Sequence, residues 1–205
     1  MWYSLVKQLV ALALRLYHRV EVTGASNIPQ TGPIVLVGNH VSYLDPFYIG
    51  ASFPRQIHFM AKEESFKHPI LKRILLSLEA FPIQRGKIDL RSIRKAFVYL
   101  KEGQVVGMFP EGGRRDENPM EEIKQGAAYI ALKTTAHLLP VYIEGTSQAL
   151  PRDAKWIRPA RIQIRYGEPI TVDPSGGRGE QERISGELLE ALHRLSKKGS
   201  GQRVS

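Results

Sequence analysis

Two residues that could transfer a proton stand close together near the start of the chain. His40 and Asp45 are separated by four residues in the segment Asn-His-Val-Ser-Tyr-Leu-Asp. An imidazole that donates the proton of one nitrogen to a carboxylate leaves its other nitrogen free to accept a proton, as a general base does. A pair at this spacing also arises by chance, so its context must decide.

The backbone must turn between the two residues if they are to meet, because positions five apart on a straight helix are about 140° out of phase. The apolar run Ile34–Val37 ends at Gly-Asn, and Pro46 suits the first turn of a helix that Ser42 or Asp45 could cap. We therefore expect a strand end that leads into a helix start, where open α/β sheets bind ligands. The pair resembles a hydrolase triad without its serine, so a hydroxyl group of the substrate could be the nucleophile. Alternatively, the pair only holds a loop together.

A second cluster of candidate site residues follows the apolar run Val105–Phe109. The chain continues through Pro-Glu111-Gly112-Gly into Arg114. Adjacent glycines let backbone N–H groups approach an anion, and a guanidinium group binds phosphate through two hydrogen bonds. Arg85 and Lys124 could join the same pocket. These residues predict a phosphate site, and the alternative is an exposed turn with solvated arginines.

Two other motifs are weaker. The segment Gly-Thr-Ser147-Gln-Ala approximates the nucleophile elbow Gly-x-Ser-x-Gly, but its last glycine is missing and Pro151 would interrupt a following helix. We therefore expect Ser147 to be a loop residue. His58 and His68 lack the spacing of helical metal ligands, and no carboxylate cluster accompanies them. We expect neither a metal site nor a cofactor.

Short apolar runs alternate with helical patterns along the chain. The expected strands are Val20–Val22, Ile34–Val37, Ile57–Ala61, Phe81–Gln84, Val105–Phe109, Leu138–Ile143 and Arg161–Arg165. The expected helices are Pro46–Ser52, Pro69–Leu78, Leu90–Glu102, Gly126–Thr134 and Glu180–Ser196. This alternation predicts an α/β domain in which a mostly parallel central sheet of about seven strands is flanked by helices.

Composition limits the range of partners. A chain of 205 residues fits one domain with a sizeable core, and the lack of Cys excludes disulfides and thiolate chemistry. The formal net charge of +9 favours phosphorylated substrates, acidic lipid headgroups, acidic carrier proteins or nucleic acid. The basic residues are scattered and form no recognition-helix or RNA-binding pattern, so we expect no nucleic-acid binding.

Residues 2–18 have the pattern of an amphipathic helix. Its longest apolar run, Leu9–Leu14, has six residues, whereas about twenty are needed to cross a bilayer. The helix could pack on the domain or lie in a membrane interface. Residues 66–78 form a second amphipathic stretch with three cations, which could cover the sheet or contact anionic lipid.

Taken together, the motifs resemble those of the glycerolipid acyltransferase family, whose type member is 1-acylglycerol-3-phosphate acyltransferase. The similarity covers roughly residues 20–170. Four blocks match in order, namely Asn39-His-Val-Ser-Tyr-Leu-Asp-Pro46, Ala80-Phe-Pro-Ile-Gln-Arg85, Phe109-Pro-Glu-Gly-Gly-Arg114 and Leu139-Pro-Val141.

Three positions depart from the family pattern. Glu79 stands where the second motif usually has Gly, Gly113 replaces the usual Thr, and Arg115 replaces the usual Ser. The His40–Asp45 pair is intact. We therefore expect the departures to affect the pocket for the headgroup of the acceptor, where the extra cation at position 115 could help to hold a phosphate.

The resemblance implies a role for each candidate residue. His40 would deprotonate the hydroxyl of a lysophospholipid as it attacks the thioester of acyl-carrier protein or acyl-CoA, and Asp45 would orient His40. The acceptor pocket would contain Arg85, Glu111, Gly112, Arg114 and Lys124. The expected reaction acylates the sn-2 hydroxyl of 1-acyl-sn-glycerol-3-phosphate, giving phosphatidic acid. Another lysophospholipid, glycerol phosphate, or a non-catalytic lipid-binding role are the alternatives.

The resemblance also implies a domain organisation and a location. Residues 1–18 would form a membrane-interface helix, residues 19–196 the acyltransferase domain and residues 197–205 a polar C-terminal tail. Because a lysophospholipid and a long acyl chain both prefer the bilayer, we expect monotopic attachment to the cytoplasmic face of the cell membrane, in contact with anionic lipids.

Overall fold

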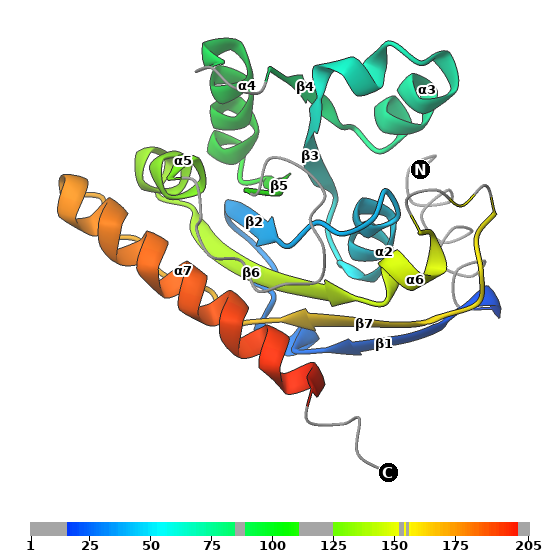
Figure 1. Ribbon diagram of the computed structural model, residues 1–205. Coiled ribbons are helices and arrows are strands. Elements are labelled where there is room, and N and C mark those ends of the chain that lie inside the picture. The colour runs from blue at the N-terminus through cyan, green and yellow to red at the C-terminus, as the bar shows by residue number, and fades with distance from the viewer. Residues whose placement is uncertain (1–15, 85–88, 111–124, 152–153, 155, 201–205) are drawn as a thin grey trace.

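A seven-stranded sheet with the order β1-β7-β6-β2-β5-β3-β4 forms the centre of the molecule (Figure 1). The computed structural model describes all residues except 1–15, 85–88, 111–124, 152–153, 155 and 201–205. The strands are β1 (Arg19–Thr23), β2 (Ile34–Gly38), β3 (Ile57–Lys62), β4 (Phe81–Ile83), β5 (Val105–Met108), β6 (His137–Glu144) and β7 (Arg161–Tyr166). The α/β fold with a mostly parallel sheet of about seven strands is confirmed.

Helices follow most of the strands and cover both faces of the sheet (Figure 1). The described α-helices are α2 (Asp45–Ser52), α3 (Pro69–Ser77), α4 (Leu90–Lys101), α5 (Gly126–Thr134), α6 (Thr146–Ala149) and α7 (Gly177–Ser200). Two short 3₁₀-helices, η1 (Ala25–Asn27) and η2 (Glu63–Phe66), complete the described elements.

The two faces of the sheet bury separate apolar clusters because side chains alternate along each strand. In β2, Val35 and Val37 pack into the cluster formed with α4, α5 and α7. Ile34 and Leu36 point to the other face and pack with Tyr48 and neighbouring residues of α2. Every residue of β2 is therefore buried, which explains its continuously apolar sequence.

Strand direction decides which loops meet at the edge where β2 ends. Among the described strands, neighbours pair in parallel except β6 and β7, where Tyr142 lies opposite Arg165. β1 pairs in parallel with β7, so both run against the other five strands. As a result, the starts of β1 and β7 lie at the same edge of the sheet as the ends of β2 and β6.

Most expected elements agree with the structure to within a residue or two at each end, and the larger differences are at α6 and α7. Ser147, expected in a loop, lies in the short helix α6, which ends at Ala149 before Pro151. α7 begins at Gly177, three residues before the expected Glu180, because the Gly-rich sequence conceals its first turn. It continues to Ser200, so the first four residues of the expected C-terminal tail are helical.

Most of the expected N-terminal helix lies outside the described residues. Leu16 and Tyr17 are helical, and the chain then enters β1 at Arg19. Among the described helices, none is both long and apolar enough to cross a bilayer.

Candidate active site

His40 and Asp45 meet at the edge of the sheet where β2 ends. His40 is the second residue after β2, which ends at Gly38, and Asp45 is the first residue of α2. The distance from His40 Nδ1 to Asp45 Oδ2 is 2.9 Å. When Nδ1 carries the proton that this contact requires, Nε2 is the nitrogen that can accept a proton from a substrate.

The carboxylate of Asp45 is completely buried and is held by further hydrogen bonds. Its Oδ2 also accepts the backbone N–H groups of Val41 and Ser42, each at 2.8 Å. Its Oδ1 accepts the hydroxyl of Thr146 at 2.5 Å. Together with the His40 imidazole, these groups make four hydrogen-bond donors to the carboxylate, and they compensate for the loss of its hydration. They also fix the carboxylate in position beside the imidazole.

Thr146 is a site residue that sequence reasoning missed. It stands 101 positions after Asp45 and is fully buried at the start of α6. The preceding Gly145 has φ +93°, and a Cβ there would lie 2.0 Å from the carbonyl oxygen of Arg161. Only glycine fits this turn, which aims Thr146 at Asp45. The sequence carries only part of the signal, because Gly-Thr follows an expected strand, whereas the adjacency of β6 and β2 is seen only in the structure.

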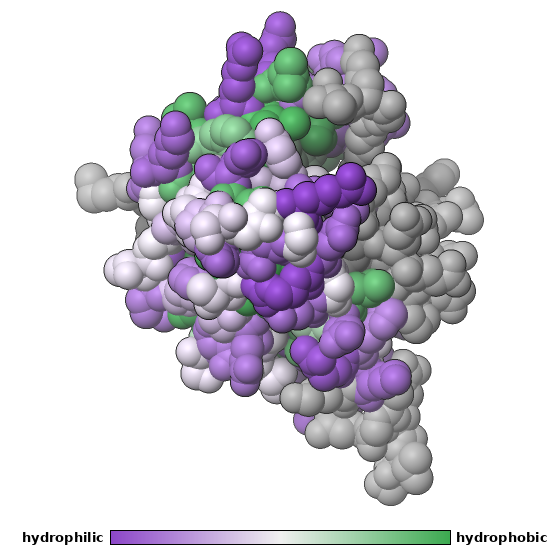
Figure 2. Space-filling model, turned by 90° about the vertical axis from the view of Figure 1, so that its left-hand side faces the viewer, coloured by the Kyte–Doolittle hydropathy of each residue, from purple (hydrophilic) through white to green (hydrophobic). Residues whose placement is uncertain are grey.

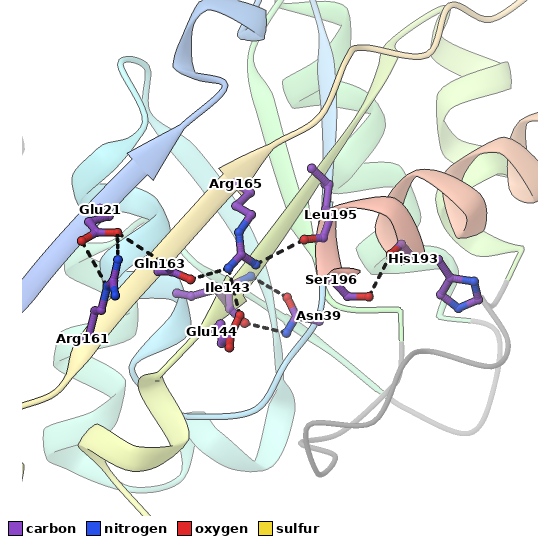
Figure 3. Close-up of polar contacts among 10 residues, drawn as sticks. All are labelled: Glu21, Asn39, Ile143, Glu144, Arg161, Gln163, Arg165, His193, Leu195 and Ser196. Carbon is purple, nitrogen blue, oxygen red and sulfur yellow. Dashed lines mark hydrogen bonds and ion pairs between the residues drawn. The ribbon is translucent and has the colours of Figure 1, made fainter. Parts of the chain in front are cut away.

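A side chain–backbone pair locks the ends of β2 and β6 together (Figure 3). Asn39 Nδ2 donates to the carbonyl of Ile143 at 2.8 Å, and the N–H of Ile143 donates to Asn39 Oδ1 at 2.8 Å. Asn39 is buried and immediately precedes His40. The pair therefore fixes the point from which the imidazole leaves the sheet.

A second anchor in the same region joins three elements through Arg165 (Figure 3). This buried guanidinium contacts Glu144 at 2.9 Å and donates to the carbonyl of Leu195 in α7 at 3.2 Å. It also donates to the side chain of Gln163. These contacts hold the end of β6, and thus the start of α6, against β7 and α7.

The first residue of the third motif lies against the imidazole. The ring of Phe109 stacks on His40, with 4.3 Å between ring centroids and an angle of 17°. Phe59 lies parallel to Phe109 on the same side of the sheet, at 5.8 Å between centroids. The structure thus brings the start of the Phe-Pro-Glu-Gly segment next to the His40–Asp45 pair.

His40 opens into a cavity of about 330 Å³ whose walls are mainly apolar. The cavity lies between the end of β3, α2 and α3. Its walls include Phe47, Phe59, Met60, Ala61, Leu71, Leu75, Leu78 and Ala80. Lys62 and Ser65 add polar groups. An apolar chain can therefore lie in the cavity while the group that it carries reaches the imidazole.

The five residues expected to bind the acceptor lie outside the described residues. They are Arg85, Glu111, Gly112, Arg114 and Lys124. Their roles stay predictions. Among the described residues, Phe109, two residues before Glu111, stacks on His40, and β4 ends at Ile83, two residues before Arg85.

The departure at Glu79 has a structural explanation away from the His40 cavity. Glu79 has φ +55°, the left-handed conformation that glycine adopts without strain. Its carboxylate lies 3.7 Å from His58 Nδ1, in a separate cavity of about 390 Å³ that Arg55 and Gln104 also line. Glu79 does not line the cavity at His40. The expectation that this departure affects the acceptor pocket stays a prediction, because the residues assigned to that pocket lie outside the described residues.

Comparison with known proteins identifies the family. The sequence model of the Acyltransferase family matches residues 19–144, which include the strand ends and the His40–Asp45 pair. The chain belongs to this family. It is an O-acyltransferase, and its place in phospholipid metabolism follows from the relatives that it matches.

Individual relatives of this acyltransferase agree with the family match. The 1-acyl-sn-glycerol-3-phosphate acyltransferase of Bacillus subtilis is 29% identical over 196 residues, and the match covers 95% of each chain. The enzyme of the same name from Borreliella burgdorferi is 30% identical over 131 residues, 63% of this chain and 52% of that protein.

A solved relative has the same fold as this acyltransferase. The crystal structure of the 1-acyl-sn-glycerophosphate acyltransferase PlsC from Thermotoga maritima aligns with a TM-score of 0.75 and 25% sequence identity. The alignment covers 99% of this chain and 81% of the Thermotoga chain. The arrangement of the sheet and its helices is therefore that of the PlsC structure.

Proposed function

We propose that this acyltransferase moves a fatty acyl group from an acyl thioester to the sn-2 hydroxyl of 1-acyl-sn-glycerol-3-phosphate, giving phosphatidic acid. The observation that carries the proposal is the fixed His40–Asp45 pair, 2.9 Å apart, at the mouth of an apolar cavity. The names of the relatives from Bacillus and Borreliella support this acceptor.

The reaction needs two proton transfers, one from the acceptor hydroxyl to His40 and one from His40 to the leaving thiolate. Nε2 of His40 accepts the proton of the acceptor hydroxyl while its oxygen attacks the thioester carbonyl. The resulting imidazolium is stabilised by Asp45, which its other donors keep in place. When the tetrahedral intermediate collapses, the C–S bond breaks and the leaving thiolate takes the proton from His40. No acyl-enzyme is formed, because the nucleophile belongs to the substrate.

The apolar cavity suits a fatty acyl chain. Each methylene group removed from water stabilises the complex by about 0.8 kcal/mol. Because Phe59, Leu71 and Leu75 line the walls and His40 also borders the cavity, a chain bound there holds its reacting end near the imidazole. Acyl-carrier protein and acyl-CoA present the same thioester, so both are candidate donors and no cofactor is required.

The acceptor phosphate needs cations, and the family motif supplies them in sequence. We assign Arg85, Arg114 and Lys124, with Glu111 and Gly112, to the pocket of the glycerol phosphate. The formal net charge of +9 agrees with anionic substrates. Charge-assisted hydrogen bonds of this kind contribute about 1.5–3 kcal/mol each in a partly dry site.

We further propose that the enzyme works as a monotopic protein on the cytoplasmic face of the cell membrane. Helix α3 supports this location, because some of its apolar side chains line the cavity and another is exposed on the surface. Leu71 and Leu75 line the cavity, whereas Leu76 is exposed. Lys72 and Arg73 are exposed beside them, and such cations attract anionic lipid by about 1 kcal/mol each near a charged surface.

A panel of acceptors and donors tests the proposed reaction. Purified enzyme is given lysophosphatidate, glycerol phosphate or lysophosphatidylcholine, each with acyl-carrier protein and CoA thioesters. We expect lysophosphatidate to be used at least about tenfold faster than the other two. In lysophosphatidylcholine the choline ester blocks one phosphate oxygen, and a lost charged contact costs about one decade or more, whereas glycerol phosphate lacks the acyl chain that burial would stabilise. A preference for lysophosphatidylcholine would overturn the acceptor assignment.

A further inference from the structure

Two segments that are distant in sequence form one exposed apolar surface. Leu16 and Tyr17 are 80% and 50% exposed, and Trp156 and Ile157 are 82% and 43% exposed. The Tyr17 hydroxyl donates to the carbonyl of Ile157 at 2.9 Å, so the segments touch. We call these four residues the aromatic platform. A tryptophan with most of its surface in water is unusual for a folded chain and indicates a partner.

The platform lies at the same edge of the sheet as the catalytic pair. Tyr17 immediately precedes the turn into β1, and Trp156 precedes β7. Both strands start where β6 ends, and Gly145 at that end contacts the carbonyl of Arg161. In Figure 1, α2 and α6 are on the side away from α5 and from the first turns of α7. Figure 2 shows the side of the molecule that carries α5 and the first turns of α7, and that side is mostly hydrophilic.

Buried His18 connects the platform to the catalytic helix. Its Nδ1 accepts the hydroxyl of Tyr48 at 2.5 Å, and its Nε2 donates to the carbonyl of Arg158 at 2.9 Å. Tyr48 lies in α2, three residues after Asp45, or about 4.5 Å along the helix axis. A surface bound by the platform is therefore held at a fixed position relative to the His40–Asp45 pair.

We propose that the aromatic platform docks on a lipid bilayer at the level of the headgroups. Tryptophan and tyrosine favour this zone because their rings are apolar and their N–H and O–H groups stay hydrated. Arg19 and Arg158 are exposed beside the platform, and Glu21 pairs with Arg19 and Arg161, which leaves a local excess of positive charge. This excess fits anionic lipid. The inference rests on the proposed function, which requires lipid substrates to reach His40.

Intrinsic fluorescence tests the platform directly. The chain contains two tryptophans, Trp2 and Trp156, so Trp2→Phe leaves Trp156 as the single reporter. We expect its emission to shift to the blue on vesicles of phosphatidylcholine with phosphatidylglycerol, and brominated acyl chains to quench it. Unshifted, unquenched emission from protein that sediments with the vesicles would overturn the proposal.

A matched pair of variants measures the contribution of the platform. Trp156→Ser should lower the partition coefficient on the anionic vesicles at least about tenfold, since burying such a side chain is worth more than one decade. Leu90→Ser removes an apolar side chain that is 60% exposed on α4, on the other side of the molecule, and should leave partitioning unchanged. Equal loss in both variants, or none in Trp156→Ser, would overturn the proposal.

Two further readouts separate the competing explanations. If Trp156→Ser converts a dimer to a monomer while vesicle binding persists, the platform joins two copies of the chain and the membrane proposal is wrong.

The proposed reaction is tested separately with lysophosphatidate dispersed in detergent, where no bilayer is present. Failure there with normal vesicle binding would overturn the reaction but not the platform. For Trp156→Ser we expect the ratio of the vesicle rate to the detergent rate to fall about tenfold.

Discussion

Two histidine–carboxylate pairs lie at opposite ends of the parallel strands, and they differ in how the carboxylate is held. At the end of β2, Asp45 is completely buried and hydrogen-bonded to His40 and three other donors. Near the start of β3, the half-exposed Glu79 lies 3.7 Å from His58 Nδ1. That nitrogen is buried and has no hydrogen-bond partner among the described residues.

The difference shows what turns a histidine into a base. His40 borders an apolar cavity, and its partner carboxylate cannot move away. The ring of His58 instead stacks on Tyr99 at 3.8 Å between centroids, and burial lowers its pKa. Proximity of the two residue types is therefore insufficient, because the carboxylate must be fixed and the free nitrogen must face the substrate.

Removing each imidazole should separate the two pairs most clearly. We expect His40→Ala to lower the rate of acyl transfer by ~10²–10⁴-fold, the usual contribution of a positioned base. His58→Ala should retain most of the activity, because His58 does not border the His40 cavity. Initial rates with labelled acyl donor measure both, with thermal melting to check folding. Similar losses in the two variants would contradict the assignment of His40.

Replacing the carboxylates tests whether the fixed position matters. Asp45→Asn keeps the shape but puts an amide among donors that need acceptors, so the orientation of His40 is lost. We expect kcat to fall about 10²-fold, the lower part of the range for a base. Glu79→Gln should be neutral in activity, as its carboxylate forms no hydrogen bond with His58. Activity of Asp45→Asn at the wild-type level would show that His40 needs no orienting carboxylate.

Thr146 tests the remote support of the catalytic pair. Thr146→Val removes one of four donors to Asp45 while keeping the volume of the side chain. We expect kcat to fall about tenfold with little change in KM, because a hydrogen bond to a charged group is worth about 1.5–3 kcal/mol when fully lost. Thr146→Ser retains the hydroxyl and should restore the rate. If Val and Ser variants are equally active, the hydroxyl has no part in positioning Asp45.

The comparison also indicates which parts of the site can be read from sequence. His40 and Asp45 are five positions apart, so the turn Gly-Asn and the helix start at Pro46 sufficed to predict their contact. The strands were predictable for a similar reason, since β2 is apolar throughout and covered on both faces. These features depend on neighbours in sequence.

Other parts depend on contacts between distant segments. Thr146 reaches Asp45 only because β6 and β2 are adjacent strands, and the sheet order is not written in any local pattern. The start of α7 was hidden by Gly177 and Gly179, whose low helix propensity is outweighed by tertiary packing of the helix on the sheet. The separate location of Glu79 likewise required the pairing of β3 with β4.

Glu79 offers a gain in stability without a change in chemistry. A non-glycine residue in the left-handed conformation is strained by about 1–2 kcal/mol, which Glu79→Gly should relieve. The greater freedom of glycine in the unfolded chain offsets part of this gain. We expect the free energy of unfolding to rise by about 0.5–1 kcal/mol with unchanged acyl transfer. Urea unfolding measures it, and Glu79→Ala, which keeps the strain, is the control.

The smallest effect should be the response of folding to pH at His58. Burial lowers the pKa of His58 in the folded protein, helped by Lys95, while Glu79 acts in the opposite direction. Below the ordinary histidine pKa of about 6.5, the unfolded chain therefore takes up a proton that the folded protein resists.

The free energy of unfolding should consequently fall as the pH decreases from 7 to 5, and His58→Phe, which cannot titrate, should make this fall shallower. Urea unfolding at several pH values gives the slope. The pH profile of acyl transfer should be unchanged in the same variant, because the base is His40. If the free energy of unfolding of His58→Phe changed with pH as steeply as that of the wild type, His58 would not resist protonation in the folded protein. If the pH profile of acyl transfer shifted in His58→Phe, the His58–Glu79 pair would influence the His40–Asp45 pair, although the two lie at opposite ends of the strands.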